Sequence, residues 1–393
     1  MSPLFFKITL SRNLRKYILQ GQPWVYKDAI VLPKKNLAGL CQVHDKKGFI
    51  AWAFYDKDSP LALRILSTEK NIPDEAFFKN QFLKSLASRK NINTNFTNAF
   101  RLINGEGDYF PGLVCDIYNH TAIIQFDGSG PELFWKKERR FNFNWIFDFT
   151  SAESIVIKSR HIKNNTGMFF LGDEKKDFTK IIIKENNLNF LVNVLDGQKT
   201  GFFLDQRDNR NYVEGLSSGK SVLNLFSYTG GFSVYAGRGG SKKVCSVDLS
   251  SPAINYAQKN WELNNLPNNV HNTLSEDILK WLEKKPDNLW DIVIVDPPSM
   301  AKSKDQKQIA TKKYINLFSA AIKFLKPGGD LILSSCSSHI NFSDFQEIIN
   351  QAVSVNRKKA QVFRLSSQGS DHPYLQSMPE SRYLKFVHLK LSL

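Results

Sequence analysis

A cysteine, three aspartates and a glycine-rich turn attract attention because each follows a predicted strand. The turn is Leu223–Phe232, the aspartates are Asp248, Asp277 and Asp296, and the cysteine is Cys336. If these strands are parallel neighbours in one sheet, all five features lie at one edge, where open α/β sheets bind their ligands. The pattern predicts a ligand site that combines carboxylates with a thiol.

The glycine-rich turn favours a nucleoside-containing ligand. Its glycines let the backbone pass close to a ligand, and its spacing is not GxGxxG, so a dinucleotide is less favoured than a smaller nucleoside. Asp248 follows about 20 residues later, where a carboxylate can accept hydrogen bonds from ribose hydroxyls. A glycine turn or a strand-end carboxylate alone is a weak signal, and their combination carries the prediction.

The chemistry of the edge depends on Asp296 and Cys336. Two prolines follow Asp296 and stiffen the chain beside its side chain. A cysteine at a strand end is placed to act as a nucleophile, although a free cysteine is more often a small buried hydrophobic residue. We expect the nucleophilic role for Cys336. We expect the buried role for Cys41, Cys115 and Cys245.

Alternating apolar runs and helical patterns must position these residues, as in a doubly wound parallel sheet. The predicted strands are 221–226, 243–247, 291–295 and 330–334, and a further strand is expected before Ser275. The predicted helices are 252–263, with Ser251 as its N-cap, and 306–324. This pattern predicts an α/β domain over residues 186–393.

The rest of the chain reads as two smaller domains. Residues 1–70 predict a mostly β module. Its strands are expected at 30–32, 39–43, 49–54 and 61–66. Residues 71–185 predict an α+β domain. Its expected elements are a helix at 74–88 and strands at 112–117 and 122–126.

Composition and charge limit the class of protein. The 393 residues are 42% hydrophobic and carry 53 basic against 37 acidic side chains, a net charge of +16 that attracts polyphosphates such as nucleic acid. No apolar run reaches the roughly 18 residues of a membrane span, so no membrane association is expected. The four cysteines lack zinc-ligand spacing, and we expect no metal and a reducing cytoplasm.

The motifs together resemble a known family. The segments are KTGFFLDQR at 199–207, FSYTGGF at 226–232, VDLS at 247–250, DPPS at 296–299 and SSCS at 334–337. In this order they resemble the class I S-adenosylmethionine-dependent methyltransferases of the RlmI type, which methylate carbon 5 of cytosine in 23S ribosomal RNA. The similarity covers nearly the whole chain, including QPWVY at 22–26 and RYLK at 382–385.

The resemblance implies a Rossmann-like methyltransferase domain behind a small β-rich PUA-like RNA-binding domain and an α+β central domain. It implies a cofactor site for S-adenosylmethionine formed by Phe203, Asp205, Gln206, Asn224, Phe226, Tyr228, Gly230, Asp248, Asp277 and Asp296. Asp248 would hold the ribose hydroxyls, Asp277 the adenine amino group, and Asp296 the sulfonium end or the target base. Cys336 would be the nucleophile, and the partner would be ribosomal RNA with a single-stranded or looped target.

Two departures and three alternatives remain. The family often has phenylalanine as the second residue after Asp-Pro-Pro, where this chain reads Ser299-Met300, and no second cysteine lies beside Asp296, which implies a mechanism with one cysteine. Guanine N-methylation by the same fold needs no thiol, and a non-catalytic RNA-binding protein needs no intact site. A nicotinamide-linked enzyme is opposed by the missing GxGxxG. The sequence leaves the oligomeric state open, with a homodimer as one candidate.

Overall fold

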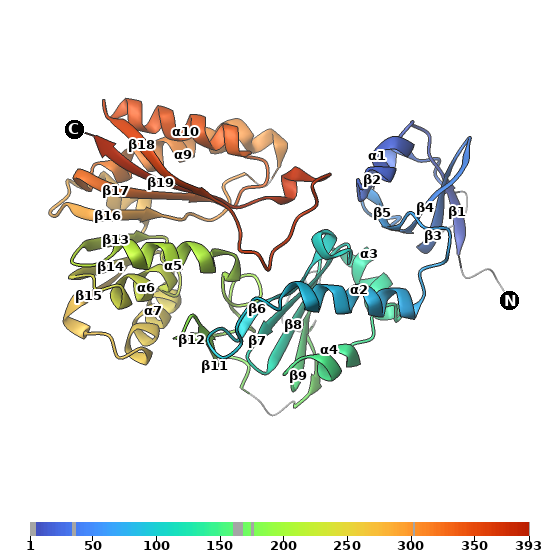
Figure 1. Cartoon of the computed structure of the whole chain (residues 1–393). Coiled ribbons are helices and arrows are strands. Elements are labelled where there is room, and N and C mark those ends of the chain that lie inside the picture. The colour runs from blue at the N-terminus through green and yellow to red at the C-terminus, as the bar shows by residue number, and fades with distance from the viewer. Residues whose placement is uncertain (1–4, 34–36, 160–167, 174–176, 302, 393) are drawn as a thin grey trace. The chain divides into compact units, whose positions relative to one another are not determined.

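The computed structural model describes residues 5–33, 37–159, 168–173, 177–301 and 303–392. The chain divides into two compact units, each built from several segments (Figure 1). The first unit comprises Met1–Ile181, Val192–Phe202 and Ser370–Pro379. The second comprises Ile182–Leu191, Phe203–Gly369 and Glu380–Leu393. The predicted domain boundaries after residues 70 and 185 stay a prediction.

The first unit begins with a five-stranded sheet in the order β1-β3-β4-β5-β2. Its elements are β1 (Phe6–Thr9), α1 (Arg15–Leu19), β2 (Trp24–Tyr26), β3 (Gly39–Asp45), β4 (Gly48–Tyr55) and β5 (Leu61–Ser67). Three of the four predicted strands are confirmed. The strand predicted at 30–32 is wrong: Ile30 forms only an isolated bridge with Leu10, and the next two apolar side chains are more than half exposed.

A second five-stranded sheet follows, in the order β10-β9-β8-β7-β6. Its strands are β6 (Ala99–Asn104), β7 (Leu113–Tyr118), β8 (Thr121–Phe126), β9 (Ser154–Lys158) and β10 (Met168–Gly172). The accompanying helices are α2 (Glu75–Ser88), α3 (Ser129–Glu132) and α4 (Asn144–Phe149). The Asp74 side chain caps α2 by accepting a hydrogen bond from Phe77 N. The predicted helix and both predicted strands are therefore confirmed.

The second unit is built on a seven-stranded sheet in the order β15-β14-β13-β16-β17-β19-β18. Its strands are β13 (Ser221–Leu225), β14 (Lys243–Asp248), β15 (His271–Ser275), β16 (Trp290–Val295), β17 (Leu325–Ser335), β18 (Lys359–Ser366) and β19 (Lys385–Ser392). A separate hairpin pairs β11 (Ile181–Glu185) with β12 (Leu188–Val192). Strands β13 to β17 are parallel, and β19 runs antiparallel to β17.

Helices cover both faces of this sheet, because alternate apolar residues point to opposite sides. Leu223, Val293 and Leu333 pack with helices α8 (Ile278–Glu283), α9 (Lys307–Ile322) and α10 (Phe342–Val355). Val222, Ile292 and Ile332 pack with α5 (Arg207–Leu216), α6 (Gly231–Arg238) and α7 (Ser251–Leu263). Figure 1 shows the two helical layers. The predicted doubly wound fold is confirmed.

Two details differ from the expectations for this unit. The N-cap of α7 is Ser250, whose hydroxyl accepts a hydrogen bond from Ala253 N, and not Ser251. Two adjacent serines can serve as the N-cap, and with Ser250 in that role the helix begins at Ser251 and Pro252 occupies its second position. Strand β17 also begins at Leu325, five residues before the predicted start at 330, and includes Pro327, Gly328 and Gly329.

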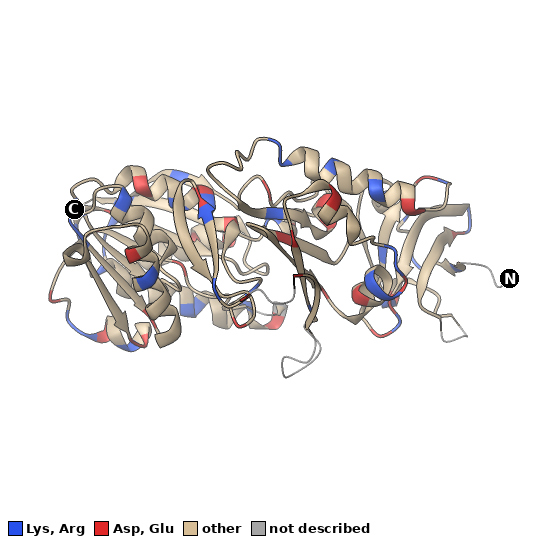
Figure 2. Cartoon of the chain, turned by 90° about the horizontal axis from the view of Figure 1, so that it is seen from below, with Lys and Arg blue, Asp and Glu red and all other residues tan. Residues whose placement is uncertain are grey.

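Charge and apolarity are distributed through both units. Figure 2 shows basic and acidic positions interspersed in both parts of the chain. Among the described residues, no helix combines the length and the apolarity that a membrane crossing would need.

Candidate active site

The loop after β13 has an unusual backbone. Phe226, Tyr228 and Gly230 have positive φ angles of 59°, 48° and 79°. For the two aromatic residues this conformation costs about 1–3 kcal/mol each and persists only where the surroundings impose it, commonly at ligand sites. Two hydrogen bonds to β14 hold the loop: Ser227 N donates to Val247 O at 3.0 Å, and Tyr228 N donates to the Asp248 carboxylate at 2.8 Å.

Gly230 lets α6 and α7 approach each other. A Cβ atom at this position would lie 2.8 Å from the Ala257 Cβ atom, closer than carbon atoms can pack. The residue is also the N-cap of α6. The packing of α6 against α7 is therefore a reason for glycine at this position that is independent of the predicted cofactor contact.

Asp248 and Asp277 lie at the carboxyl ends of neighbouring strands. Asp248 ends β14 and is partly buried, and its second carboxylate oxygen accepts a hydrogen bond from Ser250 N at 2.9 Å. Asp277 follows β15 as the N-cap of α8, with one oxygen accepting from Leu279 N at 3.0 Å and Lys280 N at 3.3 Å. Each carboxylate retains lone pairs for further donors, such as hydroxyl or amino groups.

The same edge contains buried polar atoms that suit a polar ligand. Asn224 Oδ1, Ser227 Oγ and Thr229 Oγ1 have no hydrogen-bond partner among the described residues. Buried polar atoms are normally paired, and those that are not often mark a ligand or ion site. The Phe203 and Tyr228 rings pack edge to face, with their ring centroids 5.2 Å apart. A nucleoside with a charged amino-acid end fits this donor and acceptor set.

Gln206 is hydrogen-bonded to Asp296 at this edge of the sheet. Asp296 follows β16 and is partly buried, and Gln206 Nε2 donates to its Oδ2 at 3.0 Å. Asn209 in turn donates to Gln206 Oε1 at 2.7 Å, and the Tyr383 hydroxyl donates to Asp205 Oδ2 at 2.6 Å. Because Asp205 and Gln206 are each 2% exposed, these contacts favour a supporting role. Their direct contact with the cofactor stays a prediction.

Cys336 differs from the other cysteines in its surroundings. It follows the last residue of β17 and is partly buried, whereas the other three cysteines are buried. Burial raises the pKa of Cys245 to about 11 and the pKa values of Cys41 and Cys115 further still. The expected buried role of these three cysteines is confirmed, and Cys336 is the one of the four that is only partly buried.

A serine ties the loop after Asp296 to the loop that carries Cys336. Ser337 Oγ accepts hydrogen bonds from Met300 N at 3.1 Å and Ala301 N at 3.4 Å. It also exchanges hydrogen bonds with Ser299 Oγ at 3.1 Å and Tyr314 OH at 3.0 Å. Ser299 thus joins the two loops. Ser337 and Tyr314 were not predicted from the sequence. The serine-rich run around Cys336 was a signal for Ser337, whereas Tyr314 lies in α9, far along the chain, and had no such signal.

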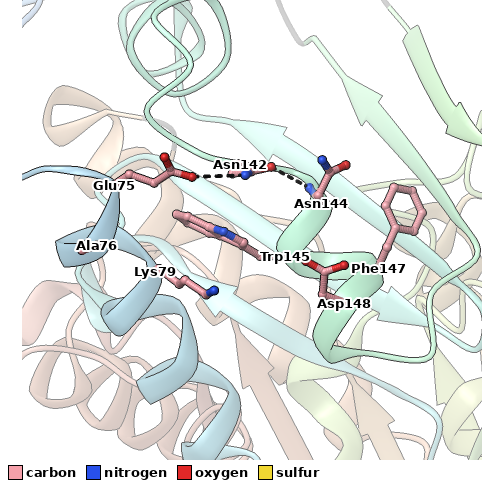
Figure 3. A pocket seen from close by; sticks show the side chains of 8 residues that line it. All are labelled: Glu75, Ala76, Lys79, Asn142, Asn144, Trp145, Phe147 and Asp148. Atoms are coloured by element: carbon pink, nitrogen blue, oxygen red, sulfur yellow. Dashed lines mark hydrogen bonds between the residues drawn. The ribbon is translucent and has the colours of Figure 1, made fainter.

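A separate depression lies in the first unit. It has a volume of about 660 Å³ and lies between α2 and α4 (Figure 3). Its charged side chains are Glu75, Lys79 and Asp148, and Asn142 donates a hydrogen bond to Glu75 at 3.2 Å. Two carboxylates and one amine do not favour nucleic acid, and the depression contains no nucleophilic thiol. We therefore place the candidate active site at the strand ends of the second unit.

The doubly wound sheet, the strained first loop and the carboxylates at successive strand ends define an α/β enzyme with a site for a nucleoside cofactor. Residues 145–356 match the family described as S-adenosylmethionine-dependent methyltransferase, and residues 8–68 match a PUA-like domain. The chain belongs to the S-adenosylmethionine-dependent methyltransferases, in the group of its RlmI-type relatives.

Relatives and solved structures agree with this membership over almost the whole chain. The ribosomal RNA large subunit methyltransferase of Deinococcus radiodurans is 34% identical, covering 98% of this chain and 97% of the relative. Ribosomal RNA large subunit methyltransferase I of Pseudoalteromonas translucida is 33% identical, covering 98% and 99%. The crystal structure of SMU.776 complexed with SAH has a TM-score of 0.85 and 26% identity, covering 98% and 99%. The resemblance found in the sequence is confirmed.

Proposed function

We propose that this protein transfers the methyl group of S-adenosylmethionine to carbon 5 of a cytosine in large-subunit ribosomal RNA, through a covalent bond to Cys336. The names of the relatives and the PUA-like domain support the RNA substrate. The partly buried Cys336 directly after β17, next to the strand that ends before Asp296, is the observation that supports the covalent mechanism.

In this proposal, different residues at the strand ends bind different parts of the cofactor. Asp248 would accept hydrogen bonds from the ribose hydroxyls, and Asp277 would accept one from the adenine amino group. Asn224, near the end of β13, and Tyr228, in the loop that follows, would hold the methionine and ribose parts. When bound, the cofactor supplies an electrophilic methyl group on a sulfonium.

The thiol is needed because carbon 5 of cytosine is a poor nucleophile. The Cys336 thiolate adds to carbon 6, and the displaced electron pair makes carbon 5 able to attack the methyl group. Removal of the carbon-5 proton then restores the double bond and expels the thiolate. Asp296, oriented by Gln206, would hold the cytosine or accept that proton.

The substrate must present an unstacked cytosine. A base within a duplex has to be turned out of its stack, at a cost of a few kcal/mol, and a single-stranded or looped target reduces this cost. The basic chain, with its net charge of +16, suits a polyphosphate partner. A cytoplasmic location and a homodimer stay predictions, and light scattering would measure the oligomeric state.

Guanine N-methylation by the same fold is less well supported. Enzymes that methylate exocyclic amines commonly stack the base on an aromatic residue after the Pro-Pro step. Ser299 has no ring and is hydrogen-bonded to Ser337. An inactive RNA-binding protein would not need the intact edge from Asp248 to Cys336.

The test is methylation of ribosomal RNA isolated from a strain that lacks the protein. With radiolabelled S-adenosylmethionine, we expect label in 5-methylcytidine after nuclease digestion and chromatography. Cys336→Ala should abolish the label while leaving S-adenosylhomocysteine affinity within a few fold, and Cys245→Ala should retain activity. Label in a methylated guanosine, or full activity of Cys336→Ala, would overturn the proposal.

A further inference from the structure

A buried lysine lies beside the partly buried Cys336. Lys385 begins β19 and is 1% exposed, and in the antiparallel register its Cα atom faces that of Ser335. Its ammonium donates hydrogen bonds to Ser337 O at 2.6 Å and to Tyr383 O at 2.7 Å. Lys385 therefore contacts Ser337, the residue after Cys336, and pairs in the sheet with Ser335, the residue before it.

The ammonium has no carboxylate partner among the described residues. Its two hydrogen-bond acceptors are neutral carbonyl groups, which compensate a buried charge only in part. The carboxylate of Asp344, at the start of α10, is already paired with Lys307 at 2.7 Å and accepts a hydrogen bond from Asn341 N. The Tyr314 hydroxyl, from α9, is engaged with Ser335 and Ser337.

The electrostatics agree with this geometry. Burial lowers the pKa of Lys385 to about 8, and the negative charges of Cys336 and, to a smaller extent, Asp344 oppose that decrease. The lysine is therefore charged below about pH 8 and becomes neutral above it. An anion at Cys336 would be the counter-charge that the buried ammonium otherwise lacks.

We propose that Lys385 is a positioning residue whose ammonium stabilises the thiolate form of Cys336 and holds the cysteine loop through Ser337. The inference rests on the proposed nucleophilic role of Cys336 and extends it. The thiol proton leaves to water, and the lysine keeps its own proton throughout. Because the thiolate is the attacking form, this arrangement makes the nucleophile available at neutral pH.

The test is the rate at which iodoacetamide alkylates Cys336, followed by mass spectrometry from pH 5 to 10. A positive charge nearby lowers the pKa of an acidic group by roughly 1–3. Removing that charge in Lys385→Met should therefore slow alkylation at pH 7 by about tenfold or more. The two rates should converge near pH 10. Lys385→Arg should retain most of the wild-type rate, because it keeps the charge.

Lys220→Met is the matched control. Lys220 is partly buried and paired with Asp330 at the opposite end of the sheet, so its loss should leave the alkylation profile unchanged. Melting and S-adenosylhomocysteine binding should show that each variant is folded. An unchanged pH profile in folded Lys385→Met would overturn the proposal, and so would equal slowing by Lys220→Met.

A second measurement does not require the methionine variant to fold. The absorbance of the wild-type protein near 240 nm at pH 7, minus that of Cys336→Ala, should show one thiolate, and no difference would overturn the proposal. Neither measurement requires methyl transfer. If Cys336→Ala methylates RNA normally while the alkylation effect remains, the proposed function fails and the charge pairing stands.

Discussion

Replacing Ser337 by alanine should loosen the two loops that carry Asp296 and Cys336. The Ser337 side chain is fully buried, and its hydroxyl joins four groups from the loop after β16 and from α9. The substitution leaves Met300 N without this acceptor and Tyr314 OH with one partner fewer. A buried polar group that loses its partner costs about 1–3 kcal/mol, and the 3.4 Å contact to Ala301 adds little.

We therefore expect Ser337→Ala to lower the free energy of unfolding of the second unit by about 2–3 kcal/mol. For a unit of this size, that loss lowers the melting temperature by about 5–10 °C. Calorimetry and urea denaturation would measure both quantities. Methyl transfer should also slow, because Cys336 is less well held, while S-adenosylhomocysteine affinity stays within a few fold.

Ser338→Ala is the control, because Ser338 is exposed and follows directly in the chain. Surface substitutions of this kind change stability by less than about 0.5 kcal/mol. If Ser337→Ala is as stable and as active as Ser338→Ala, the hydroxyl network does not hold the site and the reasoning is wrong.

Three further predictions concern the second unit. Glu185→Gln should lower the free energy of unfolding by about 3–5 kcal/mol in urea denaturation, because it removes the carboxylate that pairs with the buried Arg210 guanidinium at 2.7 Å; a loss below 1 kcal/mol would contradict this. Asp248→Ala should weaken S-adenosylhomocysteine binding by roughly 10- to 100-fold in calorimetry, since hydrogen bonds to a charged group contribute about 1.5–3 kcal/mol; unchanged affinity would remove Asp248 from the ribose site. Burial opposes ionisation of Asp291, but hydrogen bonds from Lys326 and Ser221 lower its pKa to about 2. The wild-type protein should therefore be more stable than Asp291→Asn above about pH 4, and this difference in the free energy of unfolding should shrink towards about pH 2. A difference that does not change with pH would refute the assignment.

The sequence predicted the sheet well because its central strands are continuous apolar runs. Val293 and Leu223, for example, are completely buried between two helical layers, so the strand pattern is unambiguous. The strand predicted at 30–32 was wrong because an apolar run forms a strand only where a neighbouring strand pairs with it. The N-cap of α7 was displaced by one residue because two adjacent serines satisfy the same rule.

The position of a candidate residue was predictable where that residue lies at a strand end, as with Asp248 and Cys336. It was not predictable where contacts join distant segments. The hydrogen bond from Gln206 to Asp296 spans 90 residues, and that from Lys385 to Ser337 spans 48. No local pattern contains such pairs, because they exist only after β16, β17 and β19 are aligned.

The most direct test of the account is to trap the bond between Cys336 and cytosine. Large-subunit ribosomal RNA transcribed with 5-fluorocytidine has no carbon-5 proton to remove, so after methyl transfer the adduct cannot release the thiolate. With S-adenosylmethionine present, we predict a protein–RNA species that survives denaturing electrophoresis, with the RNA mapped to Cys336 by mass spectrometry. Methylated fluorinated RNA without any such species, or an equal yield from Cys336→Ala, would contradict the account.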